Sequence, residues 1–267
     1  MLDTSLKKRL IPKLLIRYRK IGSLLRPVLV TTRQYSDVYD MGDAVSQAKI
    51  YEAQLADELI VLNINETPIA NDTAMLMMVQ QLASETFMPL AVGGGVRTLS
   101  DFSYLLEHGA DKVCINSAAI VNPSLISEAA NQFGSQCVVV SIDFHKDSQG
   151  NNVVFSKHIK QSMPLDVVEW AVRAVDGGAG ELLLTDVDRD GTGCGLNCAL
   201  GRTVADLVPV PVILSGGCGL AEHFVDGFQY GGAEAVAAGT FFSFRDQNPM
   251  QTRAHIRNAG VQIRMEI

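Results

Sequence analysis

Two aspartates that follow short apolar runs are the first candidates for chemistry. Asp143 ends the run 137–143, and Asp190 follows a leucine-rich run that begins at Glu181. Runs of this length suit strands buried on both faces, and α/β enzymes place polar groups at the carboxyl ends of such strands. Paired carboxylates there suit general acid–base catalysis. The simpler interpretation, in which Asp190 caps a turn and Asp143 orders a loop, is less favoured.

Glycine-rich turns recur and indicate phosphate binding. Gly93-Gly94-Gly95 precedes Asn116-Ser117, and Gly216-Gly217 precedes Gly239-Thr240 at a similar spacing. Without a Cβ, backbone N–H groups can approach a phosphate closely. One glycine run would be weak evidence because turns need glycine anyway. Two related copies predict two phosphate sites and a substrate with a phosphate at each end.

A second group of charged residues opens four of the apolar runs and sums to zero charge. These residues are Arg9, Glu58, Lys112 and Glu181. They would lie at the amino ends of the strands, on the face opposite the aspartates. They are either solvated strand ends, which contribute little as surface pairs, or a ring that closes the axis of a barrel.

The elements that must position these residues alternate along the chain. Strands are expected at 9–16, 58–64, 89–92, 112–115, 137–143, from 181, at 211–214 and at 235–238. Helices are expected from 42, at 71–86, 100–108, 123–133, 165–175, 197–207, 220–229 and 249–258. Eight alternating pairs predict an α/β fold, a single (β/α)8 TIM barrel over residues 1–267. Residues 17–41 are expected to be a long irregular loop, and residues 144–163 a hairpin insertion.

The two halves of the chain resemble each other. Gly94-Gly95 corresponds to Gly216-Gly217, Asn116-Ser117 to Gly239-Thr240, and Glu58 to Glu181. A repeat of nearly half the chain is too long for a solenoid. It predicts a barrel built from two homologous half-barrels.

Length, charge and cysteine content exclude several classes of protein. The 267 residues match a barrel of about 250, and a net charge of −7 argues against nucleic acid. Five cysteines, an odd number, predict reduced thiols and a cytoplasmic location. Cys194 and Cys198 lack a second ligand pair, so no metal or other cofactor is expected. No stretch could span a bilayer. The basic first forty residues lack a targeting pattern; they are a solvated loop or an anion-binding lid.

Six motifs resemble the HisF family, the cyclase subunit of imidazole glycerol phosphate synthase. They are VGGGV (92–96), GADKVCINSAA (109–119), NPSLI (122–126), FGSQCVVVSID (133–143), GAGELLLTDVDRDGT (178–192) and ILSGGCG (213–219). In that family a HisH-like glutaminase docks on the barrel floor, and ammonia passes along the axis to a bisphosphate substrate at the mouth.

The resemblance implies a role for each matching residue. Arg9, Glu58, Lys112 and Glu181 would be the ammonia gate, and Asp111 would lie at the glutaminase interface. One phosphate would be bound by Gly95, Asn116 and Ser117, and the other by Gly191, Gly217, Gly239 and Thr240. Asp143 and Asp190 match catalytic aspartates of the family.

Three departures from the family pattern bear on function. Leu15 stands where the family has its other essential aspartate, and Asn63 replaces a second aspartate. The usual loop-one sequence is missing, and Arg26 is the candidate to replace its lysine. A leucine cannot transfer a proton, so half of the cyclase chemistry is absent.

Residues 12–15, Pro-Lys-Leu-Leu, resemble a HisF-like branch linked to bacterial surface-polysaccharide (lipopolysaccharide) clusters. That branch implies a HisH-like glutaminase, an ATP-dependent ligase-like partner, and ammonia for amidation or amidination of a sugar precursor. This hypothesis is favoured. The alternatives are the histidine-pathway cyclase, a noncatalytic docking scaffold and, more weakly, a barrel isomerase of the same pathway.

Overall fold

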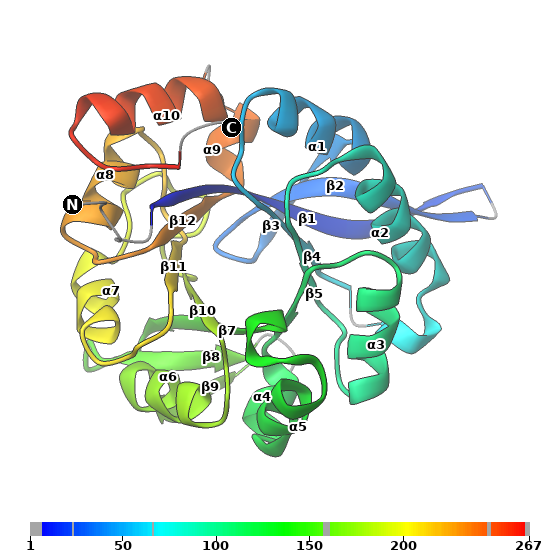
Figure 1. Ribbon diagram of the computed structural model, residues 1–267, viewed down its shortest axis with the longest axis horizontal. Helices are drawn as coiled ribbons and strands as arrows, with labels where there is room; N and C mark the ends of the chain where they lie inside the picture. Colours follow the sequence, from blue (N-terminus) through cyan, green and yellow to red (C-terminus); the bar gives the residue numbers. More distant parts are fainter. Residues whose placement is uncertain (1–6, 23, 66, 157–160, 245–246, 265–267) are drawn as a thin grey trace.

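The computed structural model describes the chain apart from residues 1–6, 23, 66, 157–160, 245–246 and 265–267. Eight parallel strands form a barrel, which Figure 1 shows end-on. The pairing of β7 with β10 closes it. The barrel strands are β1 (Arg9–Ile21), β4 (Leu59–Asn63), β5 (Leu90–Gly93), β6 (Lys112–Ile115), β7 (Val138–Lys146), β10 (Glu181–Asp186), β11 (Val212–Ser215) and β12 (Ala235–Ala238). The expected (β/α)8 barrel is confirmed.

Helices surround the barrel and follow the strands in the expected order (Figure 1). They are α1 (Ala44–Ala53), α2 (Thr73–Glu85), α3 (Leu99–Glu107), α4 (Ser117–Val121), α5 (Ser124–Phe133), α6 (Val167–Asp176), α7 (Cys198–Ala205), α8 (Glu222–Gln229), α9 (Thr240–Phe244) and α10 (Pro249–Asn258). Short 3₁₀ turns lie at η1 (Ile69–Asn71) and η2 (Ser135–Cys137). α3 is capped by Thr98, because Thr98 and Asp101 form a reciprocal capping box.

Two apolar clusters divide the core. The larger one lies between the strands and the helices and includes Leu10 and Leu14 of β1. The smaller one fills the barrel interior and consists of Ile11, Ile60, Ala91, Cys114, Val139, Leu183, Ile213, Ala235 and Ala237, with Leu62 beside it. Since side chains alternate along a strand, Arg9, Lys13 and Leu15 share the inward face of β1 with Ile11.

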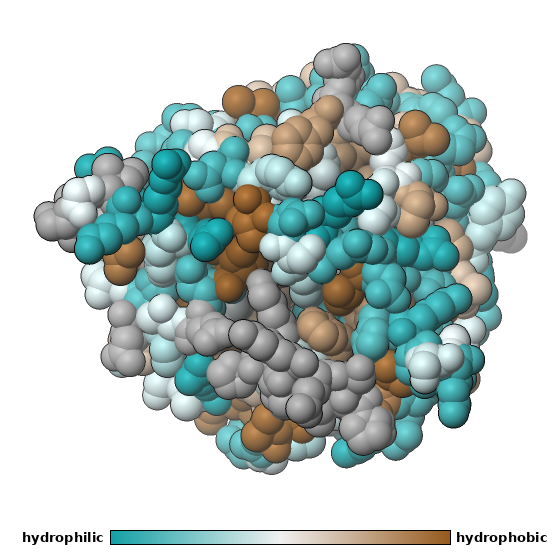
Figure 2. All heavy atoms as spheres, turned by 180° about the vertical axis from the view of Figure 1, so that it is seen from behind, coloured by the Kyte–Doolittle hydropathy of each residue, from teal (hydrophilic) through white to brown (hydrophobic). Residues whose placement is uncertain are grey.

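The prediction of an irregular segment at 17–41 is wrong. β1 continues to Ile21 and pairs antiparallel with β2 (Leu24–Arg33), which pairs antiparallel with β3 (Asp37–Gly42). The ends of β1 and β2 project from the barrel (Figure 1), and from behind this ribbon carries mostly hydrophilic side chains (Figure 2). An antiparallel ribbon can face water, so its many charges hid the strand pattern.

A hairpin also follows β7, where the sequence indicated one. β7 pairs antiparallel with β8 (Asn152–Ser156), and β8 pairs with β9 (Gln161–Asp166). Because β7 continues into this hairpin, Asp143 lies inside the strand instead of at its end. Asp190 lies beyond the end of β10, in the turn that follows Asp186. The predicted positions of both aspartates at strand ends are therefore corrected.

Candidate functional site

Four charged side chains form a closed ring at the amino-terminal floor of the barrel. Arg9 donates to Glu58 over 2.7 Å and also to Glu181. Lys112 Nζ donates to both Glu58 oxygens at 2.9 and 3.0 Å and to Glu181 Oε2 at 2.8 Å. Each carboxylate thus bridges both cations, as the ring hypothesis requires and a set of solvated strand ends would not.

The ring lies largely out of water. Glu58 is 2% exposed, and Arg9 and Glu181 are also buried, whereas part of the Lys112 side chain reaches the surface. Burial alone would lower the pKa of Arg9, but the charges of Glu181 and Glu58 outweigh burial and raise it. The pKa of Lys112 is raised in the same way, with burial outweighed by Glu58 and Glu181. The two cations of the ring therefore stay ionised at neutral pH.

Asp111, the expected glutaminase contact, is exposed beside the ring at the start of β6. Its carboxylate accepts a hydrogen bond from the Leu90 N–H over 2.8 Å, which ties β6 to β5. The residue is thus accessible on the floor and also has a structural role there.

Asp143 and Asp190 lie together at the opposite end, the mouth. Asp143 is 8% exposed, and its carboxylate accepts a hydrogen bond from Asn116 Nδ2 over 2.9 Å. Burial raises the pKa of Asp143 to about 6, against the opposing influence of Tyr35, Lys13 and Asn116. A carboxyl group with this pKa can take up or release a proton near neutral pH.

Tyr35 was not predicted and comes from the turn between β2 and β3. Its backbone and that of Gln34 are left-handed, at φ 57° and 50°, which is uncommon for residues other than glycine. The turn is fastened because Gln34 N donates to Asp190 O over 2.8 Å. Burial raises the pKa of the Tyr35 hydroxyl, as do the nearby carboxylates of Asp143 and Asp190. The turn therefore lies across the mouth.

Asp190 connects this turn to the barrel interior. Its Oδ2 accepts from Thr32 Oγ1 over 2.8 Å, and its Oδ1 lies 3.9 Å from Lys13 Nζ. The sequence pattern predicted no site role for Lys13. An inward-facing lysine on a barrel strand is the signal that could have found it, because a buried amine needs a partner.

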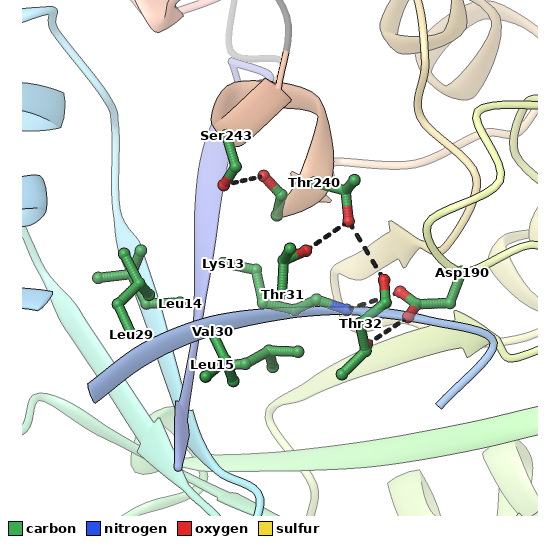
Figure 3. Close-up of a pocket in the computed structure, with 11 residues that line it drawn as sticks. Lys13, Leu14, Leu15, Leu29, Val30, Thr31, Thr32, Asp190, Thr240 and Ser243 are labelled. Atoms are coloured by element: carbon green, nitrogen blue, oxygen red, sulfur yellow. Dashed lines mark hydrogen bonds and ion pairs between the residues drawn. The ribbon is translucent and has the colours of Figure 1, made fainter. Parts of the chain in front are cut away.

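A small pocket lies above these groups, and Figure 3 shows its lining. Leu15, 9% exposed, lines this pocket at the position where the family pattern has an aspartate. Thr31, Thr32, Asp190 and Thr240 contribute polar groups to the lining. The mouth therefore has two carboxylates and one interior cation but no proton-transfer group at position 15.

The predicted phosphate-binding residues lie at the mouth. Several of them already contact other parts of the protein there. Ser117 Oγ lies 3.0 Å from Ser156 Oγ of the β8 hairpin. Thr240 Oγ1 lies 2.7 Å from Thr31 Oγ1, and a Cβ on Gly191 would come within 2.3 Å of the Thr32 carbonyl. Phosphate binding by these residues stays a prediction.

The paired glycines show why both half-barrels need them. A Cβ on Gly94 would lie 2.0 Å from the Asn63 carbonyl oxygen, and one on Gly216 would lie 2.4 Å from that of Asp186. A Cβ on Gly95 would meet the Thr67 oxygen at 2.3 Å, and one on Gly217 the Gly195 oxygen at 2.1 Å. Both copies must therefore be glycine for backbone packing alone, whatever they bind.

Asn63, the second departure from the family pattern, has a matched partner. Its Nδ2 donates to Asp72 Oδ2 over 2.9 Å, and Asp72 also caps α2. In the other half-barrel Asn197, the cap of α7, donates from Nδ2 to Asp186 Oδ2 over 3.1 Å. Acid and amide have exchanged places, so each half keeps one carboxyl group and one amide at this point.

Arg26, the candidate to replace the family's loop-one lysine, is exposed on the projecting ribbon, opposite Arg19, and does not line the pocket.

Among the described residues no group of three His, Cys, Asp or Glu side chains could hold a metal ion, and all five cysteines are free. In that same part of the chain, every helix is too short or too polar to cross a bilayer.

Fold and site together define a (β/α)8 barrel with a charged ring across its floor and two carboxylates at its mouth. A family model described as histidine biosynthesis protein matches residues 22–247. A putative imidazole glycerol phosphate synthase subunit hisF2 of Prochlorococcus marinus (strain MIT 9313) is 51% identical over 265 residues, which cover 98% of this chain and 99% of that protein. The chain therefore belongs to the HisF family of histidine biosynthesis proteins.

Proposed function

We propose that this chain is the ammonia-receiving subunit of a glutamine amidotransferase complex that modifies a surface-polysaccharide sugar precursor by amidation or amidination. A HisH-like glutaminase would dock on the floor around Asp111 and the ring. An ATP-dependent ligase-like enzyme would activate the sugar and accept the ammonia. The observation that carries this proposal is Leu15 in an otherwise family-like mouth, above a complete ring.

The ring supports a role for the barrel axis. A ring of buried ion pairs is costly to desolvate, and packing alone could close the floor with apolar side chains. Four charges that bridge one another across β1, β4, β6 and β10 suit a gate that a docked partner rearranges. Lys112 is the member that a partner on the floor could reach, because its side chain is 21% exposed.

The residues at the mouth favour transfer of ammonia over the cyclase reaction. The family resemblance implies that the cyclase reaction uses two carboxylates, one from β1 and one beside the end of β10. Asp190 is present on one side, but Leu15 on the other cannot transfer a proton. Asp143, with its raised pKa, remains available for proton transfer to or from ammonia.

The second candidate is the histidine-pathway cyclase. The name of the Prochlorococcus relative and the two carboxylates at the mouth favour it. Turnover of the histidine-pathway bisphosphate substrate with saturating ammonium separates the two, because ammonium bypasses the glutaminase. We expect no turnover by the wild type. Wild-type turnover near that of a working cyclase would overturn the proposal.

Leu15→Asp and a docking experiment complete the test. Turnover gained in Leu15→Asp would show that the rest of the cyclase machinery persists and that this one side chain removed the activity. Binding of the HisH-like glutaminase from the same organism, measured by calorimetry, should be weakened by Asp111→Lys. A control substitution on the ribbon, Arg26→Glu, should leave that binding unchanged. Absence of any binding by the wild type would contradict the role of the floor.

A further inference from the structure

Lys13 is a buried cation that neither the family pattern nor the proposed reaction uses. It is 5% exposed and follows Arg9 and Ile11 on the inward face of β1. It is the next inward-facing position after Ile11 of the apolar interior cluster, so its side chain begins one position beyond Ile11 on β1. Burying an ammonium is costly unless it is paired and hydrogen-bonded, so its contacts indicate what it does.

Those contacts lie on other strands. Lys13 Nζ donates to Ser215 Oγ of β11 over 2.9 Å and lies 3.9 Å from Asp190 Oδ1, beyond the end of β10. Since β12 lies between β1 and β11, the side chain extends past β12 to reach them. β12 is followed by Gly239, where an added Cβ would lie 3.0 Å from the Lys13 carbonyl oxygen. Figure 3 shows the amine directed at Asp190.

Inward-facing side chains follow one another from the floor to the mouth of the barrel. Each ring residue stands two positions before a member of the apolar cluster: Arg9 before Ile11, Glu58 before Ile60, Lys112 before Cys114 and Glu181 before Leu183. Lys13 stands two positions after Ile11. Along the barrel interior the charged ring, the nine apolar side chains and the Lys13 ammonium therefore follow one another from floor to mouth.

We propose that Lys13 is a second barrier on the barrel axis, closing at the mouth the route that the charged ring closes at the floor. This inference rests on the proposed function, because it assumes that the axis carries ammonia. Held by Ser215 and Asp190, the side chain obstructs the end of the axis and keeps ammonium ions of the solvent out sterically. Neutral ammonia, which can both donate and accept hydrogen bonds, passes once the lysine side chain moves.

The turn that covers the mouth holds this barrier in place. Asp190, the anionic neighbour of Lys13, accepts a hydrogen bond from Thr32 of β2, and Gln34 binds the Asp190 carbonyl. When the β2–β3 turn lifts from the mouth, Asp190 loses both contacts, and Lys13 loses the carboxylate that fixes it. Opening of the mouth and release of the barrier are therefore one event.

Cys114 provides a built-in reporter for this barrier. It lies in the apolar layer between the ring and Lys13 and is 3% exposed. Methylmercury chloride is a small neutral reagent whose mercury exchanges chloride for the thiol sulfur, releasing a proton and chloride. Its rate of addition to Cys114 in the intact chain, followed by peptide mass spectrometry, measures access to the axis. Exposed Cys194 is the internal standard for reagent activity.

Lys13→Ala should speed labelling of Cys114 by about tenfold or more, equivalent to about 1.4 kcal/mol of barrier. Lys13→Met, of similar length but uncharged, should give a smaller increase. Thr32→Val, which only frees Asp190, should also increase the rate. Leu14→Ala is the matched control, because Leu14 lies on the outward face of the same strand and its truncation destabilises β1 without widening the axis.

Equal Cys114 rates in wild type and Lys13→Ala, or equal acceleration by Leu14→Ala, would overturn the second barrier. Neither result depends on the bisphosphate assay. Turnover by the wild type would refute the proposed function while leaving the labelling rates as they are. Lys112→Ala opens the other end, so faster labelling in that variant alone would place the only barrier at the ring.

Discussion

Removal of one carboxylate from the floor ring should destabilise the protein far more than removal of an equally close surface partner. Glu58 accepts from Arg9 at 2.7 Å and from Lys112 at 2.9 Å, and is 2% exposed. The Lys49–Glu85 pair is as short, at 2.8 Å, but its side chains are 53% and 41% exposed. Glu58→Ala and Glu85→Ala thus differ in burial while the contact distance is nearly the same.

The expected magnitudes follow from that burial. Breaking a buried pair leaves an uncompensated charge and costs about 3–5 kcal/mol, whereas an exposed pair is screened by solvent and contributes little. In Glu58→Ala, Arg9 keeps Glu181, but Arg9 and Lys112 then share one carboxylate in a site with little access to water. A loss of 1 kcal/mol lowers the thermal midpoint Tm by roughly 2–4 °C for a chain of this size. The Tm of Glu58→Ala should therefore fall by on the order of 10 °C.

Urea unfolding of wild type, Glu58→Ala and Glu85→Ala, followed by circular dichroism at neutral pH, measures both costs. Added salt should weaken the contribution of Glu85 but barely change that of Glu58, because buried pairs are poorly screened. If the two variants lose free energies of unfolding within about 1 kcal/mol of each other, then the ring is not a buried electrostatic unit. The gate interpretation would lose its physical basis.

Two further predictions concern the mouth and its supports. Burial raises the pKa of Asp143 to about 6, so the native state binds this proton more tightly than the unfolded chain does. The contribution of Asp143 to stability is therefore greatest at low pH and is lost as pH rises through about 6. The free energy of unfolding of Asp143→Asn relative to wild type, measured in urea, should be more favourable at pH 7.5 than at pH 4.5. Equal differences at the two pH values would contradict the raised pKa. Asn63→Asp should destabilise the protein by placing a second carboxylate 2.9 Å from that of Asp72, and Asn63→Asp with Asp72→Asn should recover the loss. A double-mutant cycle without coupling would show that the exchange of acid and amide is incidental.

Sequence alone determined the barrel and the two ends of its axis. Short apolar runs alternating with helical segments define parallel strands, and polar groups at either end of those runs must then gather at either face. Arg9, Glu58, Lys112 and Glu181 were assigned to one face and Asp143 and Asp190 to the other on this ground. Because the alternation is local, a linear pattern carries it.

Only the tertiary structure decided what fills the mouth. Tyr35 reaches Asp143 through the pairing of three antiparallel strands whose charges gave no period along the chain. Lys13 finds its partners at Ser215 and Asp190, far along the sequence, because closure of the barrel brings β10 and β11 near β1. Contacts of this kind depend on the register and the curvature of the whole sheet. No local pattern records them.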